Sequence, residues 1–193
     1  MLLKNTQDMD NFAAVKPIFL IGYMGCGKTT LGRALSRQMG YEFIDLDIYI
    51  ENRYHRSIKE LFALHGEEGF RKIERRMLEE VSEFERTVVA CGGGTPCYFD
   101  NISLMNSKGI TVYLTTPTER IAARLSLPGA KAKRPIIAGK TDDELKQFID
   151  GNLKAREPYY SQASITFDST DIETASTTES TAAHLANILT ARQ

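Results

Sequence analysis

The sequence of 193 residues contains little that would attach it to a membrane or to a nucleic acid. No apolar run approaches the length needed to cross a bilayer, and Asp8 and Asp10 interrupt the start of the chain, so we expect no signal peptide. The 24 basic and 25 acidic side chains leave a formal net charge of -1, and no basic field favours nucleic acid. We therefore expect a soluble, cytoplasmic protein.

Cysteine and histidine are also scarce. The three cysteines, Cys26, Cys91 and Cys97, are odd in number and lack the spacing of metal ligands, which is typical of reduced thiols in a cytosol. The three histidines are scattered and form no metal pattern. A chain of this length fits one domain, so we expect a flexible extension at 1–15, a single domain at 16–193 and a monomer.

Residues 22–29 read Gly-Tyr-Met-Gly-Cys-Gly-Lys-Thr and match the pattern of a phosphate-binding P-loop. They follow an apolar run at 18–21, typical of a buried parallel strand, and precede a helical pattern at 30–39. Backbone N–H groups at such a helix start bind the phosphates of a nucleoside triphosphate. Lys28 is expected to reach the β- and γ-phosphates and Thr29 to hold Mg²⁺. The predicted nucleotide-binding residues are Gly22, Gly25, Cys26, Gly27, Lys28, Thr29 and Thr30.

Apolar runs alternate with helical patterns from the P-loop onward. Capping boxes at Ser57–Glu60 and at Ser176–Glu179 predict the starts of two helices. This alternation predicts an α/β fold with three α/β/α layers and a central five-stranded parallel sheet. The predicted strands lie at 18–21, 42–45, 87–91, 110–114 and 164–167.

Two carboxylates, Asp45 and Asp47, follow the second predicted strand. They point the same way if the strand continues, because side chains alternate along a strand. One carboxylate can hold Mg²⁺ directly or through water, and the other can accept a hydrogen bond or a proton from an acceptor hydroxyl. The alternative for Asp47 is the N-cap of a helix, which is compatible with a second role.

Three glycines, Gly92, Gly93 and Gly94, follow the third predicted strand. Bare backbone there lets a ligand approach closely and receive N–H bonds, although a flexible turn has the same composition. The strand does not end in the aspartate that many P-loop enzymes use for Mg²⁺. That absence argues against a switch GTPase or motor ATPase and gives Asp45 more weight as the residue near the metal.

Two arginines have two interpretations each. Arg71 either forms a surface ion pair with a neighbouring glutamate or provides a fork for an anionic group such as a carboxylate. Arg156 either complements the dipole at a helix C-terminus or serves as a second anion ligand.

The segment from Arg120 to Thr141 is basic and contains no acidic residue. Its turn-rich centre, at about 124–138, is typical of a mobile lid that excludes water and brings a cation such as Arg134 to the transferring phosphoryl group. A solvated basic loop is the alternative.

In this order the motifs resemble those of the shikimate kinases, which have the nucleoside-monophosphate-kinase type of P-loop fold. The resemblance covers about residues 17–168. It rests on six motifs: Gly22–Thr29, Asp45-Leu46-Asp47, Glu68–Arg71 with Glu74, Gly92–Gly94, Arg134-Pro135, and Arg156 with Tyr159-Tyr160.

The resemblance implies an enzyme that phosphorylates the 3-hydroxyl of shikimate with ATP and Mg²⁺, giving 3-phosphoshikimate and ADP in aromatic amino acid biosynthesis. Lys28 and Thr29 would then serve ATP and Mg²⁺, with Asp45 near the metal through water. The residues from 125 to 130 lack the second lid arginine that family members commonly have and that stacks on adenine. That contact is then missing or is made by Arg124 or Lys131, so the side chains that contact adenine stay unassigned.

The resemblance also implies roles at the acceptor. Asp47 would bind the shikimate hydroxyls and is the candidate base, while Arg71 and Arg156 would bind the carboxylate beside the backbone of residues 92–94. Arg134 would move with the lid toward the phosphates, so the implied catalytic residues are Lys28, Asp47 and Arg134. A kinase for another hydroxy acid such as gluconate, and a nucleotide-dependent switch protein, remain alternatives.

Overall fold

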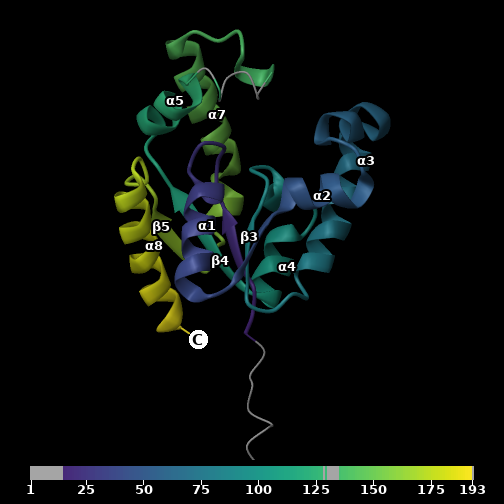
Figure 1. Cartoon of the computed structure of the whole chain (residues 1–193). Helices are drawn as coiled ribbons and strands as arrows, with labels where there is room; N and C mark the ends of the chain where they lie inside the picture. The colour runs from purple at the N-terminus through teal and green to yellow at the C-terminus, as the bar shows by residue number, and fades with distance from the viewer. Residues whose placement is uncertain (1–14, 128, 130–134, 193) are drawn as a thin grey trace, which may run out of the picture.

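Five parallel strands form the centre of the chain, in the spatial order β2-β3-β1-β4-β5 (Figure 1). The computed structural model describes residues 15–127, 129 and 135–192. Nearly all of the predicted extension, part of the predicted lid and Arg134 therefore fall outside the described residues. The strands are β1 (Ile18–Ile21), β2 (Glu42–Asp45), β3 (Thr87–Ala90), β4 (Ile110–Thr115) and β5 (Ile165–Asp168).

Helices connect these strands, as the alternating sequence pattern predicts. None of the helices in the described part of the chain is long and apolar enough to cross a membrane. The α-helices are α1 (Lys28–Met39), α2 (Leu46–Tyr54), α3 (Ile58–Val81), α4 (Asn101–Lys108), α5 (Thr118–Ser126), α7 (Asp142–Tyr160) and α8 (Ala175–Thr190), with short 3-10 turns η1 (Thr95–Cys97) and η2 (Pro135–Ile137).

Neighbouring residues of β1 belong to two different apolar clusters, one on each face of the sheet. Ile18 and Leu20 pack with α1 and α8, which lie side by side (Figure 1). Phe19 and Ile21 pack with α2, α3, α4, α5 and α7. All four side chains are fully buried, which explains why the strand is an unbroken apolar run. The predicted three-layer α/β/α architecture is confirmed.

The strand register brings three loops to one edge of the sheet. Leu20 of β1 lies opposite Ala90 of β3, and Ala90 lies opposite Asp45 of β2. The P-loop, the segment after Asp45 and the glycines at 92–94 therefore begin side by side. Ligands of open α/β sheets bind at this carboxyl edge.

The predicted bounds of β2, at 42–45, are confirmed, so Asp45 and Asp47 do not lie on one continuing strand. The strand ends at Asp45, whose side chain accepts the backbone N–H of Ile48 and caps α2. Asp45, not Asp47, is therefore the N-cap, and Asp47 lies in the first helical turn. A short carboxylate stabilises this position because it accepts an N–H that has no partner within the helix.

Other local predictions have mixed outcomes. The capping box at Ser57 and Glu60 is confirmed, and Gly66 interrupts α3 with non-helical backbone angles. The capping box predicted at Ser176 is wrong, because Thr174 and Thr177 form it instead. Glu179 is then available to accept hydrogen bonds from α1, at 2.6 Å from Arg37 and 3.0 Å from Gln38.

Two glycine substitutions test the packing of this fold. A methyl group at Gly109 would lie 2.2 Å from the Pro17 carbonyl oxygen, which also accepts the Ile110 N–H. We expect Gly109→Ala to lower the free energy of unfolding by about 1–3 kcal/mol, because backbone must shift. Gly151→Ala in α7 meets open space and should raise it by about 0.5–1 kcal/mol through helix propensity. Urea denaturation of both variants measures the difference, and equal effects would contradict the packing described here.

Candidate active site

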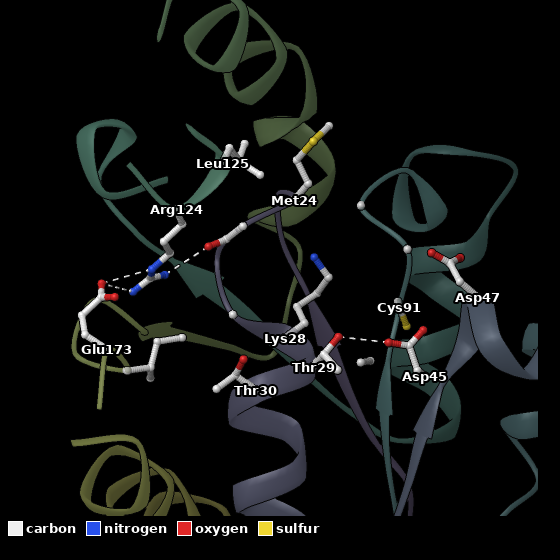
Figure 2. A pocket seen from close by; sticks show the side chains of 16 residues that line it. Met24, Lys28, Thr29, Thr30, Asp45, Asp47, Cys91, Arg124, Leu125 and Glu173 are labelled. Carbon is white, nitrogen blue, oxygen red and sulfur yellow. Dashed lines mark hydrogen bonds and ion pairs between the residues drawn. The ribbon is translucent and has the colours of Figure 1, made fainter. Parts of the chain in front are cut away.

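A cavity of about 540 Å³ lies at the carboxyl edge of the sheet. Figure 2 shows Lys28 near its centre, Asp45 and Asp47 on one side, and Arg124 and Glu173 on the other. The predicted site residues that line it are Gly25, Gly27, Lys28, Thr29, Thr30, Asp45, Asp47, Gly92 and Gly93. The other predicted residues that the structure describes lie outside this lining: Gly22, Cys26, Arg71, Gly94 and Arg156.

The P-loop folds around its glycines. Gly22, Gly25 and Gly27 have φ values of 138°, 84° and 99°, which only glycine adopts without strain. Gly27 is the N-cap of α1 and provides no side-chain acceptor for the first helical N–H groups. Those groups and the positive end of the helix are suited to an anion. Lys28 Nζ donates to the carbonyl oxygens of Gly22 at 2.8 Å and Tyr23 at 3.0 Å.

Gly22 and Cys26 support the loop from below the cavity. A methyl group at Gly22 would lie 2.7 Å from the Leu114 carbonyl oxygen. Cys26 is buried, and its carbonyl oxygen accepts the Ser169 hydroxyl at 2.8 Å. These two residues hold the P-loop against the ends of β4 and β5.

Thr29 and Asp45 form a pair that fits Mg²⁺. Thr29 Oγ1 donates to Asp45 Oδ2 at 3.0 Å, so a hydroxyl and a carboxylate already lie together. Within the described residues, no group of three or more His, Cys, Asp and Glu side chains is arranged to hold a metal. Mg²⁺ usually takes only one or two protein ligands beside the phosphates of its nucleotide, and prefers oxygen.

The environment of Asp47 weakens its acidity. Burial, together with the negative charges of Asp45 and Glu74 and opposed by Lys28, raises the pKa of Asp47 to about 6. A carboxylate with a pKa near the working pH can accept a proton and later release it.

The triple glycine lies where side chains would collide with charged groups. A methyl group at Gly92 would lie 3.2 Å from Asp47 Oδ1, and one at Gly93 would lie 3.3 Å from Arg156 Nη1. At Gly94 it would lie 3.0 Å from Arg71 Nη2. The bare backbone thus lets the carboxylate and both arginines gather around one loop, rather than forming only a flexible turn.

Arg71 does form an ion pair, but a buried one. Its Nη1 lies 2.9 Å from Glu74 Oε2, with side-chain exposures of 14% and 2%. Glu74 also accepts the Thr95 hydroxyl at 2.6 Å. Glu67 lies 3.5 Å from Arg71 Nη2, whereas Glu68 pairs with Lys72 instead. Because the pair is buried beside the glycine loop, the surface ion-pair interpretation is incomplete.

Arg156 points toward the same loop. Its Nη1 donates to the Gly93 carbonyl oxygen at 3.1 Å, and its guanidinium lies over the Tyr23 ring at 5.3 Å. The Tyr160 hydroxyl donates to the same carbonyl at 2.5 Å. The helix continues through Pro158 to Tyr160, so Arg156 does not end it as a dipole partner.

Sequence reasoning missed the other end of the cavity. Arg124 Nη1 donates to the Gly25 carbonyl oxygen at 3.1 Å, and Nη2 lies 3.0 Å from Glu173. Ile172 packs on Gly27, where a methyl group would lie 2.0 Å from its Cδ1. Arg124, the first residue of the predicted lid, lies in α5 and contacts the P-loop. Neither Ile172 nor Glu173 carries a motif that would have identified it.

The comparisons with known proteins agree with this geometry. The family model described as shikimate kinase matches residues 24–189. The chain belongs to the shikimate kinase family. A shikimate kinase of Parabacteroides distasonis is 52% identical over 154 residues, covering 80% of this chain and 88% of the relative. A solved shikimate kinase from Bacteroides thetaiotaomicron has a TM-score of 0.87 at 48% identity, covering 92% of this chain and 99% of that one.

A second solved relative includes its acceptor. The shikimate kinase of Acinetobacter baumannii in complex with shikimate has a TM-score of 0.78 at 30% identity, covering 93% of this chain and 95% of that one. The predicted P-loop kinase fold and enzyme class are confirmed, and this family uses ATP as the phosphoryl donor. The gluconate alternative finds no support among these relatives.

The raised pKa of Asp47 predicts a pH-dependent change in stability. In the unfolded chain an aspartate titrates at about 3.9, so the folded state keeps this proton to higher pH, and its stability falls as pH rises from about 4 to 6. Asp47→Asn removes the free-energy cost of ionising this carboxyl in the folded protein. We expect the variant without nucleotide or Mg²⁺ to gain about 2–3 kcal/mol above pH 7, and nothing below about pH 4. Denaturant titrations across this pH range check it, and a gain that persists at pH 4 contradicts the assignment.

Proposed function

We propose that this chain transfers the γ-phosphoryl group of ATP to the 3-hydroxyl of shikimate, giving 3-phosphoshikimate and ADP. One observation carries the proposal: the P-loop, Asp47 and the glycine backbone line a single cavity. Arg71 and Arg156 stand beside the same glycine loop and match the negative charge of a carboxylate. Donor and acceptor would therefore meet at Lys28 and Asp47.

Lys28 binds the phosphates in this proposal. Its ammonium group donates to two carbonyl oxygens of its own loop. A polyphosphate offers charged oxygens, which make stronger hydrogen bonds than neutral carbonyls, so Lys28 would turn to them. Mg²⁺, held by Thr29 and through water by Asp45, would neutralise charge on the β- and γ-phosphates.

Asp47 binds and deprotonates the acceptor hydroxyl in this proposal. It lies across the cavity from the P-loop (Figure 2), where the reacting hydroxyl must face the γ-phosphoryl group. The carboxylate orients the hydroxyl and accepts its proton as the new P–O bond forms. Phosphoryl transfer needs little covalent help, so positioning and charge neutralisation supply most of the acceleration.

Three finer points complete the proposal. Arg134 would supply a further cation to the transferring phosphoryl group as the lid at about 124–138 closes over it. The enzyme would act as a monomer, as expected for one domain of 193 residues. It would work in the cytoplasm, which suits three cysteines that are all free.

Coupled ADP release with ATP and Mg²⁺ tests the substrate. We expect rapid turnover with shikimate and only background release with gluconate or with no acceptor, because the acceptor brings the hydroxyl that Asp47 orients. Turnover with gluconate alone would overturn the substrate assignment while leaving the fold intact. Equal, acceptor-independent release would favour a nucleotide switch over a kinase.

Asp47→Asn tests the proposed base. An amide cannot accept the proton, so we expect kcat with shikimate to fall by about 10²–10⁴-fold. Binding of ATP should be retained, because Asp47 touches none of the P-loop donors described above. Stopped assays give kcat, and fluorescent nucleotide titration gives the ATP affinity. Near-normal turnover would remove Asp47 from the chemical step.

A further inference from the structure

A tyrosine outside every sequence motif stacks on the guanidinium of Arg71. Arg71 Cζ lies 3.9 Å from the centroid of the Tyr98 ring, closer than to the rings of Phe70 at 5.4 Å and Phe62 at 5.8 Å. Tyr98 directly follows η1, in the loop that begins with the triple glycine. Gly94 lies against the same guanidinium. Ring and bare backbone together fix where the charged plane of Arg71 lies.

The hydroxyl of Tyr98 acts on a second neighbour of Arg71. It donates to Glu67 Oε1 at 2.5 Å, while the same oxygen lies 3.5 Å from Arg71 Nη2. Glu67 is four residues before Arg71 on α3, the spacing at which a glutamate and an arginine pair readily. Glu67 Oε1 is therefore shared between the Tyr98 hydroxyl and Arg71 Nη2, and its shorter contact is with the tyrosine.

Arg71 also keeps one unused donor. Its Nη1 is occupied by Glu74 at 2.9 Å, but its buried Nε–H has no hydrogen-bond partner among the described residues. A buried donor without a partner is costly unless a ligand satisfies it. This free Nε–H belongs to the arginine that the proposed function assigns to the acceptor's carboxylate.

We propose that Tyr98 is a positioning residue for the acceptor's carboxylate. Its ring holds the Arg71 guanidinium beside Gly94, and its hydroxyl competes for Glu67, which therefore makes only a long 3.5 Å contact with Arg71 Nη2. This inference rests on the proposed function, because it assigns Tyr98 to the same acceptor site. Its consequence is specific: Tyr98 governs affinity for shikimate and leaves ATP binding and chemistry alone.

Tyr98→Phe and Tyr98→Leu separate the hydroxyl from the ring. In Tyr98→Phe, Glu67 can close on Arg71, so we expect the KM for shikimate to rise by about threefold. Adding Glu67→Gln to Tyr98→Phe should restore it, because the competing charge is gone. Tyr98→Leu also removes the stacked ring and should raise this KM by about tenfold, only partly restored by Glu67→Gln. Steady-state assays should give kcat and the KM for ATP within about twofold of the parent.

A matched control lies at the opposite edge of the sheet. Tyr41, just before β2, has the guanidinium of Arg86 over its ring at 5.4 Å. Tyr41→Leu removes a stack of the same kind far from the cavity, so the KM for shikimate should not change. A similar rise in this control would overturn the inference, because general loss of Tyr–Arg stacking would then explain the effect.

Further outcomes distinguish a failure of this inference from a failure of the proposed function on which it rests. An unchanged KM for shikimate in Tyr98→Leu overturns the inference, as does a parallel loss of kcat, ATP affinity and melting temperature. Arg71→Ala provides the reference, with Lys72→Ala as its neighbouring control. If Arg71→Ala leaves the KM for shikimate unchanged, the proposed acceptor site fails. If Arg71→Ala raises it and the Tyr98 variants do not, the role of Tyr98 alone fails.

Discussion

The alignment of three strand ends is the constraint on which the rest of this structure depends. Leu20, Ala90 and Asp45 lie opposite one another across β1, β3 and β2, so three loops leave the sheet at the same level. A slip of one residue would displace a loop by about 3.3 Å and turn each side chain of its strand to the other face. Burial of both sheet faces prevents such a slip, since every residue of β1 and β3 is buried. The packing of the core therefore fixes the spacing between the P-loop and the glycine loop at 92–94.

A second constraint is electrostatic and centres on the buried Glu74. This carboxylate is 1% exposed and receives hydrogen bonds from Thr95 and Arg71. Burying a charge is costly unless a partner and hydrogen bonds compensate it, and both are present. The same negative charge helps to raise the pKa of Asp47. Glu74 therefore links the positioning of an arginine to the acidity of the candidate base, although it does not line the cavity.

The parts of the fold and site that sequence predicts are those with local, repeated signals. A few consecutive residues are enough to recognise the P-loop pattern, each of the five apolar runs and the triple glycine. The structure has each of them at its predicted place. The N-cap of α2 was considered at Asp47 but lies at Asp45, because either aspartate suits a helix cap and only the local backbone decides. The start of α8 was mispredicted because several threonines and serines between 174 and 181 offer competing caps.

What sequence could not predict are contacts between residues far apart in the chain. Tyr98 and Glu67 are 31 residues apart, and Arg124 and Glu173 are 49 apart. Neither pair has a periodicity or motif, because the fold, not local spacing, brings the partners together. Arg71 shows the same limit: its spacing allows an ion pair or an anion fork, and only the surrounding rings and glycines show how the side chain is held.

The two arginines that lie beside the glycine loop at 92–94 are held in a similar way. Arg71 lies against the ring of Tyr98 and pairs with a carboxylate, while Arg156 lies over the ring of Tyr23 and donates to a carbonyl. Long side chains lose conformational entropy when they bind, so holding them beforehand favours binding. Tyr23 is also part of the P-loop, and its carbonyl oxygen accepts Lys28 Nζ. Tyr23 thus contacts both Lys28 and Arg156, and it links the P-loop to an arginine beside the glycine loop at 92–94.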